Sequence, residues 1–384
     1  MPTLNEIHRE ISKKEAEKGT AFVRKRYIQK LFKYTSRPVI LYASAFDVKG
    51  RDNLPFMIMR NDIQGFMSAL SGIEGNEVDL ILHSPGGQAE ATEQIVNYLR
   101  QKFAHIRVII PQNAMSAATM LACAADVIVM GKHSALGPID PQINFGGISV
   151  PAQSILDEFA LAQQSIAQGA PPIVWAGRVS QYPAGFLVQC SKVIELSKVL
   201  VREWLEGNMF RNEPTAKAKA AEIAEWLGDN SHFLTHGRFI GIQEAKARGL
   251  KIEALEDDQE LQEGVLSVFH ATIATFQRTE CFKLFENHRG EPPKAKALGL
   301  PFCFTDGSAY PIGKTSYTVS TDIKSVGSNP MLGRLDNDLR FVNPEHGLKP
   351  LKRRKPLYPK AKALGLYGLT CKGSYLLAQA NTKP

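Results

Sequence analysis

Long apolar runs and paired cysteines are scarce in this sequence of 384 residues. No stretch has the roughly 18 consecutive apolar residues that a membrane-spanning helix requires, and residues 1–19 are charged along their length. The five cysteines are scattered without a C-x-x-C spacing, so they indicate neither a disulfide framework nor a zinc site and favour a reducing compartment. We therefore expect a cytoplasmic protein that holds no metal and no cofactor.

Positive charge is concentrated towards the C-terminal end. The net charge is +8, yet residues 290–384 contain 15 Lys and Arg against 6 Asp and Glu, so the rest of the chain is close to neutral. The most basic segment is LKRRKPLYPKAK at 351–362, and PKAKALGL occurs at 293–300 and again at 359–366. Such a tail could bind nucleic acid or an acidic partner, or could simply be a solvated extension.

Strand and helix patterns alternate through the first two thirds of the chain. Apolar strands are predicted at 38–45, 78–84, 107–112 and 126–131, and helices at about 61–72, 88–103, 116–125, 155–168 and 191–208. Strands that are apolar on both faces and alternate with helices are typical of an α/β fold with a mainly parallel sheet. We expect a basic helical segment at 1–34, a core domain at 35–275 and a basic C-terminal extension at 276–384.

The turn Ser84-Pro85-Gly86-Gly87 stands between a strand and a helix without any polar loop. Glycine is needed where the backbone turns sharply or where a ligand approaches the N–H groups closely. The following helix start adds unpaired N–H donors. The turn is therefore a candidate anion or oxyanion site, although many α/β proteins use such turns without a ligand.

A second turn places Ser116 at the start of a helix of small residues, in PQNAMSAATMLACAAD. The helix N-terminus favours negative charge at the serine, and small neighbours let a substrate approach, as for an acyl-transfer nucleophile. The alternative is that Ser116 only caps the helix. Both turns follow strand ends of one parallel sheet, where ligand sites gather. Ser116 could then attack a carbonyl whose oxygen accepts from the N–H groups of Gly87 and Ala117.

These motifs together resemble the Clp-fold serine peptidases, and most closely the serine dehydrogenase proteinase family, which is related to the signal peptide peptidase A enzymes. The motifs are SPGG at 84–87, AMSAATMLACAADVIVM at 114–130, HSALGPIDPQ at 133–142 and HGRFIGIQEAKARGL at 236–250. The similarity extends from about residue 38 to residue 250. It implies a Clp/crotonase-like fold, a repeated ββα spiral with a mainly parallel sheet and outer helices.

The resemblance also implies a site and an assembly. Ser116 would be the nucleophile, Gly87 and Ala117 would form the oxyanion hole, and protein or peptide would be the substrate. The turn and the LGPIDPQ loop would line the cleft, with Ser84, Pro85, Gly86, Gly137 and Pro138 in contact with substrate. Members of this fold assemble, so we expect a homo-oligomer, and a helical stripe offers an apolar face: Val193, Leu196, Val199, Leu200 and Trp204.

The general base is where the sequence departs from the family. The relatives are expected to have a lysine about forty residues after the serine, in a segment such as S-I-L-K. Here the segment is Ser154-Ile155-Leu156-Asp157, and no lysine occurs between Lys132 and Lys192. A base contributes about 10²- to 10⁴-fold to such a reaction. Possible substitutes are Asp157 itself, His133 and Asp140 near the LGPIDPQ motif, a histidine such as His83 oriented by Asp157, and Lys192 or Lys198 on a later helix.

Three functions remain open at this point. The first is a serine endopeptidase that works through an acyl-enzyme on Ser116. The second is a catalytically silent Clp-fold scaffold or binding module, and the third is crotonase-type chemistry on acyl-CoA esters. The third has the least support, because crotonase-type enzymes need no nucleophile at the position of Ser116.

Overall fold

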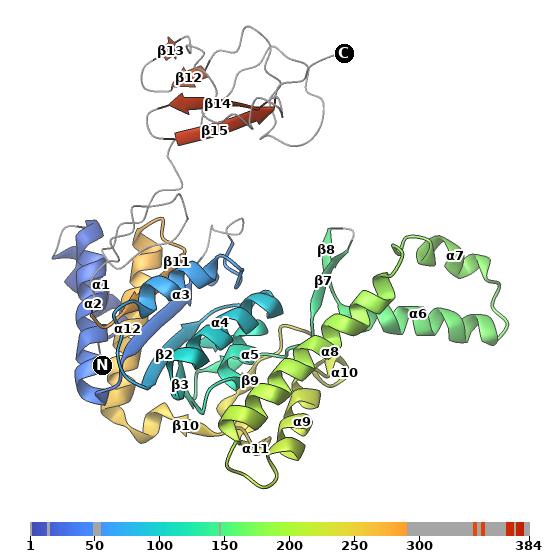
Figure 1. Cartoon of the computed structure of the whole chain (residues 1–384), viewed down its shortest axis with the longest axis horizontal. Coiled ribbons are helices and arrows are strands. Elements are labelled where there is room, and N and C mark those ends of the chain that lie inside the picture. Colours follow the sequence, from blue (N-terminus) through green and yellow to red (C-terminus); the bar gives the residue numbers. More distant parts are fainter. Residues whose placement is uncertain are drawn as a thin grey trace. The chain divides into compact units, whose positions relative to one another are not determined.

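The structure, a computed structural model, describes residues 2–13, 16–48, 55–145 and 147–289, and four short segments at 341–343, 347–349, 366–371 and 374–379. The chain divides into two units, residues 1–311 and 312–384 (Figure 1). In the second unit, β12 (Phe341–Asn343) pairs with β13 (Gly347–Lys349), and β14 (Leu366–Cys371) pairs with β15 (Ser374–Gln379), both antiparallel. The basic segment 351–362 lies outside the described residues, as do both copies of PKAKALGL apart from Leu366.

A six-stranded sheet forms the centre of the first unit (Figure 1). Its order is β10-β5-β3-β2-β1-β11, made of β1 (Val39–Ser44), β2 (Glu77–His83), β3 (His105–Ile110), β5 (Val127–Met130), β10 (Ile252–Ala254) and β11 (Lys283–Asn287). All neighbouring strands are parallel except β11, which is antiparallel to β1. The predicted mainly parallel α/β fold is confirmed, and each of the four predicted strands is present.

Helices cover both faces of this sheet, which explains why its strands are apolar on both sides. One face packs against α3 (Asp62–Leu70), α4 (Ala89–Lys102) and α5 (Ala117–Cys123). Outside these helices, α8 (Phe186–Trp204) packs on α4 and α5, and α9 (Ala216–Leu227) packs on α8. The other face packs against α2 (Ala16–Thr35) and α12 (Gln259–Arg278), where Ile28 and Leu31 meet Val265 and Phe276. Every helix in the described part of the chain is too short or too polar to traverse a bilayer.

The sheet continues past residue 275, where we expected the core domain to end. β11 pairs along β1 from Ile40 opposite Asn287 to Ser44 opposite Lys283. The N-terminal helices also belong to this body, because Ile7 and Ile11 of α1 (Leu4–Ser12) are buried against α12. No local sequence pattern distinguishes β11, an antiparallel edge strand, from the start of the predicted C-terminal extension. The sequence therefore did not reveal this strand.

A smaller apolar cluster, separate from the main core, is formed by residues between 143 and 194. It is built by the hairpin of β7 (Gln142–Phe145) and β8 (Ile148–Pro151), by α6 (Ala152–Ala167), and by the first half of α8, whereas α7 (Ile173–Val179) buries none of its residues. The stripe proposed for subunit contact runs along α8. Its residues Leu200 and Trp204 are buried in the main core of the same chain, so this stripe gives the predicted homo-oligomer no support.

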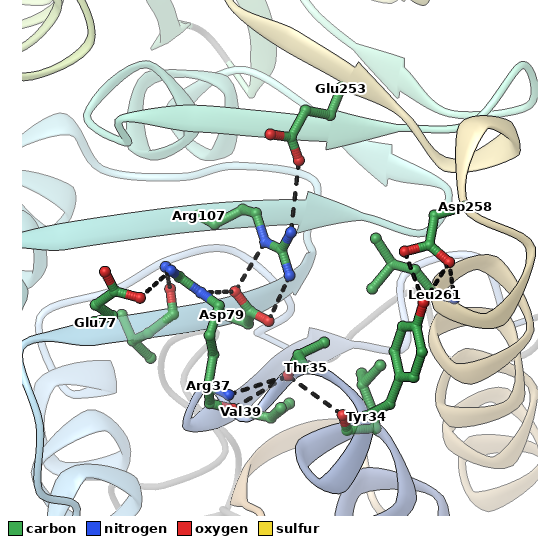
Figure 2. A network of polar contacts seen from close by, with 12 residues as sticks. Tyr34, Thr35, Arg37, Val39, Glu77, Asp79, Arg107, Glu253, Asp258 and Leu261 are labelled. Carbon is green, nitrogen blue, oxygen red and sulfur yellow. Dashed lines mark hydrogen bonds and ion pairs between the residues drawn. The ribbon is translucent and has the colours of Figure 1, made fainter.

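Charged side chains hold together the amino ends of the strands, opposite the candidate site (Figure 2). Asp79 on β2 is fully buried and accepts from Arg37 Nε at 2.8 Å and from Arg107 Nε and Nη2 at 2.9 Å each. Arg107 also lies 3.5 Å from Glu253 on β10, and Arg37 pairs with Glu77. A buried carboxylate must be paired to be tolerated, and here the pairing links three strands and the entry to β1.

Candidate active site

The two turns singled out in the sequence are hydrogen-bonded to each other beyond the ends of β2 and β3. Ser84 donates its N–H to the carbonyl oxygen of Asn113 at 3.1 Å, and its own carbonyl oxygen accepts from the N–H of Met115 at 3.0 Å. These bonds join the SPGG turn to β4 (Asn113–Ala114), and α5 begins three residues later. The turns therefore meet at the carboxyl ends of the parallel strands, where α/β sheets bind ligands.

Ser116 has an unusual backbone conformation, with φ 52° and ψ −121°. A non-glycine residue at such positive φ costs on the order of 1–3 kcal/mol, and conformations of this kind cluster at functional sites. Ser116 occupies the N-cap position of α5, but its side chain makes no capping hydrogen bond. The helix-cap alternative therefore does not account for the hydroxyl, which stays available at a partly exposed position.

Both glycines of the turn are required by close packing. At Gly86 (φ 91°), a Cβ would lie 2.4 Å from Met115 O, 2.7 Å from Ser116 Cβ and 2.8 Å from Ala117 N. At Gly87 (φ 158°), a Cβ would lie 2.3 Å from Ile58 O. Only glycine fits such approaches of backbone to backbone. The turn is thus pressed directly against the serine.

Two backbone N–H groups beside Ser116 are left without an acceptor among the described residues: those of Gly87 and Ala117. The orientation of Gly87 follows from its neighbours. Ile58 donates to Gly86 O at 2.7 Å and accepts from Gln88 N at 2.9 Å. Because successive peptide groups of an extended chain point in opposite directions, the N–H of Gly87 points away from Ile58. This pair of donors is suited to a developing oxyanion.

The LGPIDPQ loop borders the same turn. β6 (Ala135–Leu136) pairs parallel with β4 and antiparallel with β9 (Ile240–Gly241). Gly137 donates its N–H to Thr119 Oγ1 of α5 at 2.9 Å, and a Cβ on Gly137 would lie 2.6 Å from Met115 Cε. Gly137 is therefore packed against Met115 and α5, and both Gly137 and Pro138 are buried. Their contact with substrate stays a prediction.

Ser84 and Pro85 differ in what they offer to a substrate. Ser84 is fully buried, and its Oγ accepts from the N–H of Gly86 at 3.2 Å. It therefore stabilises the turn from inside. Pro85 is partly exposed.

Asp157 and His133, two of the predicted substitutes for the missing lysine, are not joined to Ser116 by any contact among the described residues. Asp157 is exposed on α6, where it accepts from Gln153 Nε2 at 2.7 Å. His133 is exposed, in the turn that precedes β6.

The two lysines of α8 are also placed without a link to the serine. Lys192 is exposed, and Lys198 Nζ pairs with Glu225 of α9 at 2.5 Å.

Asp140, the other predicted substitute, belongs to a buried pair with a histidine that the sequence argument did not single out. Asp140 is 2% exposed, and its Oδ1 lies 2.7 Å from His236 Nδ1. Its Oδ2 accepts from Gln142 Nε2 and Asn230 Nδ2, each at 3.0 Å. A carboxylate only accepts, so Nδ1 carries the hydrogen and Nε2 of the neutral ring is the acceptor. No described residue occupies Nε2, and the His236 side chain is 27% exposed.

Strand register places this pair beyond the same end of a small ladder as Ser116. β4, β6 and β9 form one ladder, in which Ala114 lies opposite Leu136 and Leu136 opposite Ile240. Ser116 follows Ala114 by two residues. Asp140 follows Leu136 by four residues, and His236 precedes Ile240 by four residues, which is the same direction because β9 is antiparallel to β6. All three thus follow the same end of a three-stranded ladder. The only local signal was that His236 opens the motif 236–250, which we had used as a landmark of the fold.

His83 is a buried histidine whose protonation opposes folding. It lies on β2 against the rings of Phe46 and Phe269, and its Nδ1 accepts from Asn113 N at 3.4 Å. Burial lowers the pKa of His83 from 6.5 to about 3. Between these values the unfolded chain binds a proton that the folded protein does not. The free energy of unfolding is therefore expected to fall by about 1.4 kcal/mol per pH unit as the pH drops below 6.5.

A His83→Leu variant is expected to lose this part of the acid sensitivity. We propose urea unfolding at about pH 7 and about pH 5, with the exposed His133→Leu as the control. His133→Leu should keep the wild-type loss of stability between the two pH values. An equal loss in His83→Leu and wild type would contradict the assignment.

Comparison with known proteins identifies the class to which this site belongs. Residues 56–169 match the family described as ClpP-like SDH-type serine proteinase. This segment contains both turns and the LGPIDPQ loop. Over this segment the chain is similar to the ClpP-like SDH-type serine proteinases. The family resemblance drawn from the sequence motifs is confirmed.

Two relatives are uncharacterized proteins of Methanocaldococcus jannaschii. MJ1495 is 46% identical over 86 residues, which cover 22% of this chain and 28% of that protein. MJ0137 is 46% identical over 160 residues, which cover 38% of this chain and 51% of that protein. The matches thus span about half of these relatives or less.

Similar solved structures are distant. A mutant of the 1510-N membrane-bound stomatin-specific protease is 18% identical with a TM-score of 0.33, and covers 54% of this chain and 79% of its own. A mutant of the same protease in complex with a substrate peptide gives 17% and 0.33, with 53% and 74% covered. A ClpP1 mutant from Listeria monocytogenes gives 14% and 0.31, with 60% and 97% covered.

Proposed function

We propose that this protein is a serine endopeptidase that hydrolyses peptide bonds through an acyl-enzyme on Ser116. The observation that carries the proposal is the strained, uncapped Ser116 beside the two free N–H groups of Gly87 and Ala117. A helix cap would need neither the strain nor the free donors. The family match supports the same class of reaction.

In the proposed reaction Ser116 Oγ attacks the carbonyl carbon of the scissile peptide. The electrons of the carbonyl bond move to its oxygen, which accepts hydrogen bonds from the N–H groups of Gly87 and Ala117. Removing one such donor typically costs about 10²- to 10³-fold in rate. The tetrahedral intermediate expels the amine, and a water molecule then releases the acyl group from Ser116.

We propose His236, held by Asp140, as the group that accepts the serine proton. With Nδ1 bonded to Asp140, Nε2 is left to take the proton from Ser116 Oγ and to pass it to the leaving amine. The carboxylate stabilises the imidazolium that forms. Asp157 and His133 are weaker proposals for this role, because their side chains lie exposed and make no contact that leads towards Ser116.

The proposal predicts specific losses of labelling by a fluorophosphonate probe. Wild type should be labelled at a single site, Ser116→Ala should not react, and His236→Gln should react about 10²- to 10⁴-fold more slowly. His133→Gln serves as the matched histidine control and should react like wild type. Mass spectrometry of the labelled peptide locates the site, and circular dichroism confirms folding of each variant.

The same experiment decides between the peptidase and a silent scaffold. A wild type that does not react overturns the peptidase proposal. If Asp157→Lys then becomes reactive, the chain is a Clp-fold scaffold that has lost its base. If wild type is labelled and His236→Gln reacts equally fast, Ser116 remains the nucleophile and the assignment of His236 is wrong.

A further inference from the structure

We infer that a buried cluster of Lys283, Asp62 and Tyr42 positions the oxyanion-hole turn through hydrogen bonds to the main chain of residues 57–59. The inference rests on the proposed function, because it concerns the N–H of Gly87 as an oxyanion donor. None of the three cluster residues is given a direct part in the reaction. They are positioning residues, and one of them lies on β11, far along the chain from both turns.

The cluster is a closed set of hydrogen bonds away from water. Lys283 is 2% exposed and Asp62 is 1% exposed. Lys283 Nζ lies 2.9 Å from each carboxylate oxygen of Asp62 and 2.6 Å from Met57 O. Tyr42 donates its hydroxyl to Asp62 Oδ2 at 2.8 Å. The Lys283 ammonium has three hydrogens, one for each of these three acceptors. An ammonium has no lone pair with which to act as a base.

The cluster holds residues 57–59 at both ends. Lys283 binds the carbonyl of Met57, and Asp62 Oδ2 accepts the N–H of Met59 at 3.1 Å. Between these two points lies Ile58, which is fully buried, whereas Met57 is 60% exposed and Met59 is 38% exposed. Side-chain packing therefore fixes only the middle residue of the segment, and the cluster determines how its main chain is directed.

Ile58 in turn determines the direction of the Gly87 N–H. It bonds Gly86 O and Gln88 N on either side of Gly87, and there is no room for a Cβ between Gly87 and Ile58. A shift of residues 57–59 would therefore move the turn with it. A displacement of about 1 Å in such a site can cost about 10²-fold in rate.

A buried ion pair is weak evidence for stability alone. Apolar residues of similar volume often replace such a pair at no cost, and Lys283 sits at an edge strand whose neighbour on the same face, Phe285, is apolar and buried. Burial lowers the pKa of Lys283, and Asp62 opposes that shift. The cost of burying the charge is consistent with a role in directing backbone rather than in packing.

The test compares Lys283→Met with Lys102→Met in the full-length protein. Lys102 also donates its Nζ to a main-chain carbonyl, that of Leu70 at 2.8 Å, but it has no bond to residues 57–59. We expect Lys283→Met to lower the maximal rate of fluorophosphonate labelling about 10- to 100-fold without changing the probe concentration at half-maximal rate. Lys102→Met should label like wild type.

Hydrogen exchange gives a second readout that does not need a reactive serine. In Lys283→Met, peptides that cover residues 56–59 and 84–89 should exchange faster, while those of β3 stay as in wild type. If Lys283→Met does not fold, Tyr42→Phe takes its place, because it removes the hydrogen bonds of the hydroxyl to Asp62 and to Ser84 of the turn and keeps the ring. It should slow labelling about 2- to 5-fold.

The outcomes separate the two proposals. If wild type is labelled and Lys283→Met matches it in labelling and exchange, the positioning role is overturned and the peptidase proposal stands. An equal drop in Lys102→Met would also overturn it, since the effect would then be general. If wild type is not labelled, the peptidase proposal fails, and exchange at 84–89 alone decides whether the cluster holds the turn.

Discussion

Gly86→Ala is expected to abolish the reaction of Ser116 with a fluorophosphonate, by at least about 10²-fold, and to destabilise the fold by about 3 kcal/mol. The added Cβ would lie 2.4 Å from Met115 O and 2.8 Å from Ala117 N. These are backbone atoms of the turn at Ser116, and they cannot move away as a flexible side chain can. The residue would in addition keep φ 91°, which alanine adopts only with strain.

Gly147→Ala is the matched control for this prediction. Gly147 also has positive φ, 84°, but a Cβ there would meet no atom within 4 Å. It carries the conformational cost of about 1–2 kcal/mol without the clash, so labelling should be unchanged. Labelling rates and urea unfolding measure the two effects. If Gly86→Ala reacted as fast as wild type, the turn would not be pressed against Ser116.

Arg24→Met is expected to lower the free energy of unfolding by about 3–5 kcal/mol. Arg24 on α2 is fully buried and binds both carboxylate oxygens of Glu286, with Nη2 at 3.0 Å from Oε1. Its Nη1 also donates to Thr275 Oγ1 of α12 at 2.6 Å. Removing the guanidinium would leave a buried, unpaired carboxylate on β11, and the polar link from this strand to α2 and α12 would be lost.

The exposed ion pair of Arg26 is the control for Arg24. Arg26 Nη2 lies 2.5 Å from Glu10 Oε1, but the side chains are 50% and 26% exposed. Arg26→Met should therefore cost no more than about 1 kcal/mol in urea unfolding. Adding Glu286→Gln to Arg24→Met should recover part of the loss, because the charge is removed together with its partner. A loss below about 1 kcal/mol in Arg24→Met would show that the buried pair is dispensable.

The sequence by itself determined the local architecture and the two turns of the candidate site. The period and length of its apolar segments predicted the four strands β1, β2, β3 and β5 and the helices between them. Turn chemistry singled out Gly86, Gly87 and Ser116, because positive φ and close backbone contact leave few residues possible. The motifs around these turns were also enough to indicate the resemblance to the ClpP-like serine proteinases that the comparison found over residues 56–169. All of these features depend on residues near one another along the chain.

Only the tertiary structure decided the partners that come from far away in sequence. His236 meets Asp140 across 96 positions, and Lys283 reaches Asp62 across 221. No local pattern distinguishes these side chains from ordinary polar residues of a loop or an edge strand. Their roles arise from strand register, which sets which residues face each other, and from burial, which makes an unpaired charge costly. Both are properties of the assembled sheet and its helices, and neither is written in any short stretch of the chain.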